Sequence, residues 1–136
     1  MGYKLIVFST PTVEDAKRIA RLLLANKLVA EVNIIPNTLI FEEIEGVIDE
    51  RSEVVVVGFT TDDKLQEATK LIHTRHGMDI PKIFLLEVVG GSKLYLEKIR
   101  SKFRVSEESE DIDWEHYGLT TEESQLEEGE YSGGDK

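Results

Sequence analysis

The stretch of sequence that decides the fold is Lys27-Leu28-Val29-Ala30-Glu31-Val32-Asn33-Ile34-Ile35-Pro36. Its first residue follows a segment in which leucines recur at helical spacing. The residues after it are rich in β-branched side chains, which favour a strand. The closing proline lacks a backbone N–H and therefore interrupts that strand. The stretch predicts a helix that runs directly into a strand.

A strand and an amphipathic helix are predicted before this stretch. The apolar run Lys4–Ser9 is rich in strand-forming residues and is followed by a turn at Pro11. Thr12 occupies a natural helix N-cap position, and apolar residues then recur at helical spacing up to Leu24. We expect a first strand that is buried on both faces and a helix that ends near Lys27.

The chain after Pro36 predicts the rest of the second strand, then a third strand, a helix, a fourth strand and a last helix. We expect a bent strand that resumes over Leu39–Ile44, then a long, charged and exposed loop from Glu45-Gly46, and then a strand over Glu53–Phe59. A helix capped by Asp62 and ended by Gly77 should follow. The last elements expected are a strand over Ile83–Val89 and a helix capped by Ser92. This β-α-β-β-α-β order with a C-terminal helix predicts an α+β, ferredoxin-like sandwich with one antiparallel sheet.

Charge divides the chain into two parts. Residues 1–103 hold 15 acidic and 14 basic residues, whereas residues 104–136 hold 12 acidic and 2 basic ones. We expect one domain over 1–103 and an acidic tail over 104–136, docked lightly at most through Trp114 and Tyr117. Because there is no basic stripe and no long apolar run, we expect neither a nucleic-acid nor a membrane partner, and a cytoplasmic protein.

Motifs of the common enzyme classes are missing from the sequence. The chain has no cysteine, so it has no thiolate for catalysis or metal binding. It contains no Ser-His-Asp set, phosphate-binding loop or dinucleotide fingerprint. Adjacent acids such as Glu42-Glu43 are typical of solvated surfaces. We therefore expect a binding or scaffold protein and not an enzyme.

Five sequence features in register resemble one family. They are the helix entry from Thr10 to Leu24, the stretch Leu28–Pro36, the turn Glu45-Gly46, the pair Thr60-Thr61, and His76 with Pro81. Over residues 3–103 the chain is similar to the CutA proteins, which are divalent-cation tolerance proteins with a PII-like fold. The resemblance implies a homotrimer in which the long second and third strands pair across subunits. Such pairing would also cover apolar strand edges that otherwise promote aggregation.

The resemblance also implies a metal site, from which this chain departs. In bacterial members, copper is associated with a cysteine and two adjacent histidines, and those places hold Ser9, Arg75 and His76 here. One imidazole beside a cation does not make a tight copper site. Glu31 replaces a further family cysteine, and His73 lies three residues before His76. One hypothesis is therefore a mixed carboxylate and imidazole site for another divalent cation. We expect a degraded copper or divalent-cation site.

Simpler interpretations of the same residues stay open. Glu31 is also typical of a solvent-facing or subunit-facing strand residue, His76 of a helix C-cap and His73 of an exposed helix face. The resemblance implies that Glu45 and Tyr95 lie in a pocket or at a subunit interface.

The leading functional hypothesis is a trimeric divalent-cation tolerance protein. One alternative is an interaction scaffold that recruits partners through the acidic tail. Another is a PII-like sensor of a small anionic ligand near Glu45–Arg51, although the acids there disfavour anions.

Overall fold

A computed structural model describes residues 2–78 and 80–104 of the 136-residue chain. The elements are β1 (Tyr3–Thr10), α1 (Val13–Ala25), β2 (Glu31–Ile44), β3 (Val47–Thr61), the 3₁₀ helix η1 (Asp62–Lys64), α2 (Leu65–Arg75), β4 (Ile83–Val88) and α3 (Lys93–Ser101). The predicted α+β order with a C-terminal helix is confirmed. The acidic tail, with Trp114 and Tyr117, lies outside the described residues apart from Arg104.

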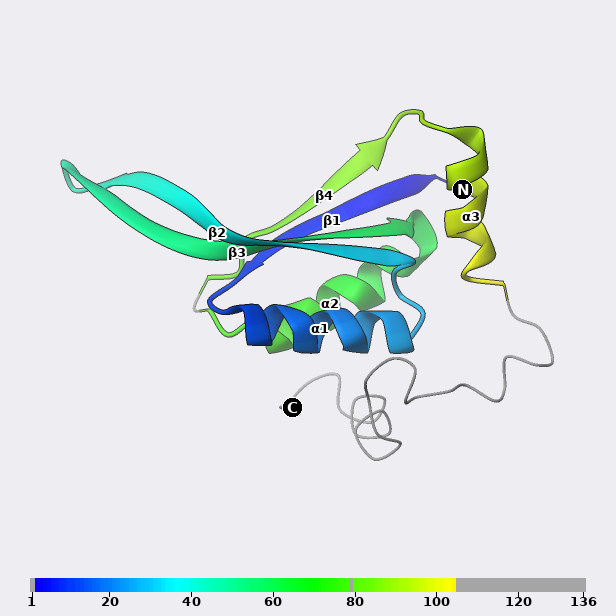
Figure 1. Cartoon of the computed structure of the whole chain (residues 1–136), viewed down its shortest axis with the longest axis horizontal. Coiled ribbons are helices and arrows are strands. Elements are labelled where there is room, and N and C mark those ends of the chain that lie inside the picture. Colours follow the sequence, from blue (N-terminus) through cyan, green and yellow to red (C-terminus); the bar gives the residue numbers. More distant parts are fainter. Residues whose placement is uncertain (1, 79, 105–136) are drawn as a thin grey trace.

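The four strands form one antiparallel sheet in the order β2-β3-β1-β4. Helices α1 and α2 lie on one face of this sheet, and α3 lies at the end where β4 finishes and β2 begins (Figure 1). The far halves of β2 and β3 continue past the helices as a projecting hairpin (Figure 1). This topology leaves β2 and β4 as edge strands within one chain.

The hydrophobic core lies between the sheet and the two helices. Ile6 and Phe8 of β1 point into it and are fully buried, and Phe8 pairs with the buried Val56 of β3. Alternation along the strand sends Leu5 and Val7 to the opposite face, where they are only half-buried. The expectation that the first strand is buried on both faces is therefore wrong for a single chain. Helix α3 reaches that second face only at one end, where Arg100 lies over the Tyr3 ring, and leaves Val7 half-buried.

The predicted helix ends are largely confirmed. The Thr12 hydroxyl accepts the Asp15 N–H at 3.1 Å, and the Ser92 hydroxyl accepts the Tyr95 N–H at 3.3 Å. Gly77 follows the end of α2 with a positive φ of 79°, which favours glycine. Asp62 does not cap α2: it begins η1, and its carboxylate accepts the Gly2 N–H at 3.0 Å.

The predicted long loop after Glu45-Gly46 is wrong. Strand β3 begins at Val47, so these two residues, both with positive φ, are the whole connection. Their φ values of 50° and 82° match the two-residue turns that suit a twisted hairpin. The charged residues beyond the turn form a strand because they pair with β2, and Arg51 contacts both Glu42 and Asp49, the two acids that face each other across the hairpin. The bend predicted at Pro36 is confirmed as a register shift between Ile35 and Thr38.

Candidate functional site

Glu31 and Tyr95 meet although 64 residues separate them. Glu31 begins β2, and the Ser92 cap places Tyr95 in the first turn of α3. The Tyr95 hydroxyl donates a hydrogen bond to the Glu31 carboxylate. The Tyr95 ring also lies edge-on to Phe59, with 6.2 Å between ring centroids, and Phe59 is the β3 partner of Glu31.

Burial raises the pKa of Tyr95 to about 12, and the hydrogen bond and charge of Glu31 act in the same direction. Tyr95 is therefore a neutral donor at physiological pH and not a base. The pair lines a hollow of about 100 Å³ together with Lys98 and Lys102. This hollow offers a carboxylate, a phenol and two ammonium groups to a polar ligand.

His76 is the C-cap residue of α2, as the simpler interpretation predicted, and it is only 8% exposed. Its Nδ1 accepts the N–H of Met78 at 2.7 Å. Burial lowers the pKa of His76, and the charge of His73 lowers it further. The two histidine rings lie edge-to-face with centroids 5.8 Å apart. His76 is therefore a neutral imidazole whose single lone pair is already in use.

The structure does not bring Glu31 to His76 within one chain. Glu31 pairs with Phe59, and Phe59 pairs with Leu5 near the start of β1. His76 precedes Gly77, and a Cβ at Gly77 would lie 3.7 Å from the Pro11 ring, beyond the end of β1. From Leu5 to the end of β1 at residue 10, five residues at about 3.3 Å each span roughly 16 Å. In residues 2–78 and 80–104, no three His, Asp or Glu residues gather as a metal centre would need.

The remaining predicted residues are Ser9 and Arg75 at the metal position, and Glu45 and Tyr95 at the pocket. Ser9 and Arg75 are both buried. Glu45 is exposed at the turn of the projecting hairpin, whereas α3, which carries Tyr95, lies at the opposite end of the molecule (Figure 1). Glu45 and Tyr95 therefore cannot share a pocket within one chain. The ligand roles of His76, His73 and Glu31 stay predictions.

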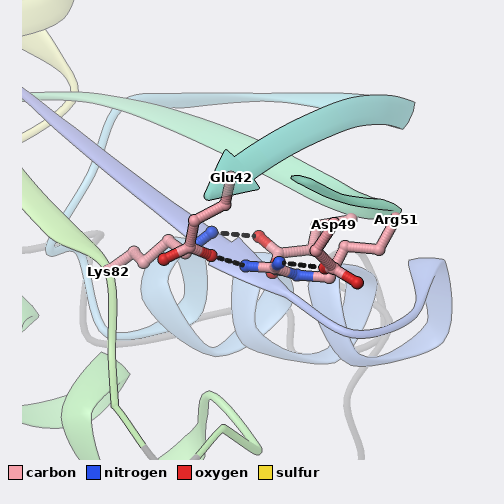
Figure 2. A network of polar contacts seen from close by, with 5 residues as sticks. Glu42, Asp49, Arg51 and Lys82 are labelled. Atoms are coloured by element: carbon pink, nitrogen blue, oxygen red, sulfur yellow. Dashed lines mark hydrogen bonds and ion pairs between the residues drawn. The ribbon is translucent and has the colours of Figure 1, made fainter. Parts of the chain in front are cut away.

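Sequence reasoning missed a network of charges at the base of the hairpin. Lys82 Nζ donates to Glu53 Oε1 at 2.9 Å, and Arg51 Nε donates to Glu53 Oε2 at 3.4 Å. The same guanidinium contacts Asp49 Oδ2 at 2.9 Å and Glu42 Oε1 at 3.0 Å. Figure 2 shows the Arg51 guanidinium between Glu42 and Asp49. Its signal in the sequence was the alternation of charges over residues 49–53.

Glu53 is the buried member of this network and is 6% exposed. Burial alone would raise the pKa of Glu53, but the hydrogen bonds and charges of Lys82 and Arg51 outweigh burial and lower it. The carboxylate is therefore charged at neutral pH, and two cations hold it in place. The network joins β3 to the chain just before β4 and fixes the base of the hairpin.

Two apolar surfaces stay open in the single chain. The face of the sheet away from the helices carries the half-buried Leu5, Val7 and Val57, and Phe84, which is 64% exposed. A groove of about 640 Å³ also runs between α2 and β4, and Leu65, Thr69, His73 and Leu85 are among its lining residues. Exposed apolar patches of this kind mark surfaces that bind another chain or a ligand. None of the described helices has the length and apolar character needed to cross a membrane.

Comparison with known proteins assigns the chain to a family. A family described as "CutA1 divalent ion tolerance protein" matches residues 4–102. The chain is 32% identical over 101 residues to the chloroplastic protein CutA of Arabidopsis thaliana, covering 74% of this chain and 56% of that protein. It is also 32% identical over 97 residues to the divalent-cation tolerance protein CutA of Archaeoglobus fulgidus, covering 71% of this chain and 94% of that protein.

Solved structures give the same answer. The CutA1 structure from Ehrlichia chaffeensis has a TM-score of 0.71 and 31% identity, and the match covers 76% of this chain and 97% of that one. The rice CutA1 structure has a TM-score of 0.70 and 27% identity, with 78% and 97% covered. The chain spans little more than half the length of the plant proteins that it matches. The chain therefore belongs to the CutA1 divalent ion tolerance family.

Proposed function

We propose that this chain is a non-catalytic, homotrimeric divalent-cation tolerance protein with weak metal affinity. The observation that carries the proposal is the uncovered apolar face of the sheet, where Val57 and Phe84 have no covering element among the described residues. A closed ring of three chains would bury this face and leave no free edge. Family membership and the divalent-cation tolerance named for its relatives agree with this proposal.

The hairpin supports a trimer of the kind that the family resemblance implies. It projects beyond its own helices and carries exposed apolar residues, such as Phe41 at 63% exposure and Ile48 at 72%. Edge strand β4 and the groove beside α2 offer a neighbouring chain both free backbone groups and an apolar lining, which includes Leu85. A neighbour's hairpin that lies along β4 would form hydrogen bonds with its free backbone groups and cover the apolar lining of the groove.

A charged substitution on the open face tests this assembly. Val57→Lys places an ammonium group at the centre of the proposed interface, so we expect sedimentation velocity to show dissociation. Glu14→Lys is the control, because Glu14 is exposed on α1, which lies on the other face of the sheet (Figure 1). If Val57→Lys assembles as the unmodified chain does, the open face is not the interface.

The residues at the family's copper position do not fit a tight metal site. A metal-bound histidine normally donates its second ring N–H to a carbonyl or carboxylate, which leaves the other nitrogen free for the metal. His76 instead accepts the Met78 N–H at Nδ1, so its proton lies on Nε2. Ser9 and Arg75 supply a hydroxyl and a cation in place of the other ligands. Metal binding here would have to break the Met78 hydrogen bond.

Calorimetric titration with Cu²⁺ and Zn²⁺ tests the weak-affinity part of the proposal. We expect a shallow isotherm with dissociation constants no tighter than roughly micromolar, which corresponds to about −8 kcal/mol. We also expect His76→Ala to change it little. Stoichiometric binding with a nanomolar dissociation constant that His76→Ala abolishes would overturn the proposal. It would show a tight metal site at the position implied by the family.

The other functional hypotheses gain no support. The scaffold hypothesis depends on the tail, which lies outside the described residues. The anion-sensor hypothesis placed its ligand on a loop at Glu45–Arg51, and that segment is a hairpin with Arg51 already held by three carboxylates. The cytoplasmic location stays a prediction, because one relative is named chloroplastic and one similar structure is titled periplasmic.

A further inference from the structure

Three lysines gather where α1, β2 and α3 meet. Lys27 follows α1, and Lys98 and Lys102 lie one turn apart at the C-terminal end of α3. Among the described residues, no carboxylate lies within ion-pair distance of these three, whereas Lys82 and Arg51 each contact an acid. The dipole of α3 favours cations at its C-terminus, where Lys98 and Lys102 lie, and the dipole of α1 does the same for Lys27. The dipoles do not account for the three side chains lining one continuous groove.

The three lysines line one groove. Two adjoining hollows, of about 100 and 90 Å³, share Ala30 and Lys102. We call this feature the lysine groove and define it by a cationic rim of Lys27, Lys98 and Lys102 and an apolar floor of Leu24, Ala30 and Ile99. The Glu31 carboxylate also lines its first hollow, where it accepts the Tyr95 hydroxyl. A rim of three positive charges over an apolar floor suits an acidic peptide that also carries apolar side chains.

Lys27 stands at a position that normally favours glycine. Its φ is 57°, and the Leu28 N–H bonds the Leu23 carbonyl at 2.9 Å while the Lys27 N–H bonds the Leu24 carbonyl at 3.0 Å. This is the Schellman geometry, in which the left-handed residue after the helix is most often glycine. A lysine here places an ammonium group on the groove despite an unfavourable backbone conformation, and such conformations cluster at functional positions.

We propose that the acidic tail of the chain itself, residues 105–136, binds in the lysine groove. The tail holds 12 acidic residues and one basic residue. It begins three residues beyond Lys102, so its position in the chain already brings it to the groove. A tethered segment of this kind acts at an effective concentration on the order of millimolar, which a free anion would have to exceed.

The tether is long enough to reach the whole rim. The acids nearest the domain are Glu107, Glu108 and Glu110, which lie three to six residues beyond Arg104. An extended chain covers at most about 3.3–3.6 Å per residue, so these carboxylates can reach roughly 10–20 Å from Arg104. Lys98 lies only about 6 Å along the helix axis from Lys102. A tail that turns back along α3 therefore meets Lys102 first and Lys98 next.

Docking there has a consequence for the polar hollow at the start of β2. Tyr95 and Glu31 line the same hollow as Lys98 and Lys102. Tail carboxylates bound at Lys98 and Lys102 neutralise these two cations, so they compete with any other anion for the hollow. The tail thus acts on the domain that carries it. This inference depends on neither the trimer nor the metal affinity proposed above.

Zero-length carbodiimide cross-linking of the full chain tests the contact directly. The reagent joins a carboxylate to an amine only where the two already touch. We expect mass spectrometry to find tail acids joined to Lys98, Lys102 or Lys27 at low salt, and at least a fivefold loss of these products in 1 M NaCl, where screening shortens the range of charge attraction. Products only at Lys17, or no tail products at all, would overturn the proposal.

A second measurement uses Trp114, the single tryptophan, which directly follows the acids at 107–113. In 1 M NaCl, the unmodified chain should show a low fluorescence anisotropy of Trp114. We expect the double variant Lys98→Gln/Lys102→Gln to show the same low value already at low salt. The matched control is Lys17→Gln/Arg21→Gln, which removes two exposed cations from α1 away from the groove. Equal anisotropy in both double variants and the unmodified chain at low salt would overturn the proposal.

Discussion

The buried carboxylate of Glu53 gives a prediction whose magnitude can be worked from the structure. Glu53→Gln removes a negative charge that Lys82 contacts at 2.9 Å and Arg51 at 3.4 Å. Hydrogen bonds to charged groups contribute about 1.5–3 kcal/mol each. Only the Lys82 bond has good length, and the Lys82 side chain is 37% exposed, so water reaches its ammonium group. We therefore expect a loss of about 2–3 kcal/mol, below the roughly 3–5 kcal/mol for breaking a fully buried pair.

The pH dependence of that loss follows from the lowered pKa of Glu53. A carboxylate with a lower pKa in the folded state stabilises the fold above its ordinary pKa, and the contribution is lost as pH falls through the folded value. The free energy of unfolding of the unmodified chain should therefore exceed that of Glu53→Gln by the full amount at pH 7. This difference should shrink steadily below pH 4.5, which is the ordinary pKa of glutamate.

Urea denaturation followed by circular dichroism at fixed protein concentration measures this difference. Glu50→Gln is the control, because Glu50 lies on the same strand, is exposed and pairs with Phe41 across the hairpin. Glu50→Gln should change the free energy of unfolding by less than about 0.5 kcal/mol, as surface substitutions usually do. Equal effects of the two substitutions at pH 7 would refute the reasoning. A Glu53→Gln loss that is unchanged at pH 3 would refute it as well.

Three further predictions concern the candidate site and the core. Because His76 has a lowered pKa in the folded state, its contribution to stability should be present above pH 6.5 and lost as pH falls. In chemical denaturation, the free energy of unfolding of His76→Gln should therefore fall less between pH 6.5 and acidic pH than that of the unmodified chain. Tyr95→Phe should remove from an ultraviolet titration a phenol that ionises near pH 12. Gly58→Ala should lower the unfolding midpoint, with a cost of about 1–3 kcal/mol, since the new Cβ would lie 3.2 Å from Val29 Cγ1.

Local signals made much of the fold predictable from the sequence. Thr12 and Ser92 cap helices through hydrogen bonds three residues along the chain, and Gly77 follows the end of α2. These features depend on a few neighbouring residues, so a single sequence contains them. The charged start of β3 was missed because its strand conformation depends on pairing with β2 and on Arg51, and neither contact can be seen in a local pattern.

The candidate site was less predictable for the same physical reason. Glu31 and Tyr95 were each identified, but their hydrogen bond joins residues 64 positions apart. The hydrogen bond from the Met78 N–H to the His76 imidazole depends on the path of the chain after α2. The periodicity of the sequence does not predict that path. The separation of Glu31 from His76 follows from sheet order and register, which are properties of the whole fold.

The mass of the assembly in solution tests the central claim most directly. Sedimentation equilibrium of the full chain at micromolar concentration should give three times the chain mass of 15.4 kDa, because burying the apolar face of the sheet stabilises the trimer. A single species of 15.4 kDa at that concentration would contradict the account, since Val57, Phe84 and the projecting hairpin would then face water in the working protein.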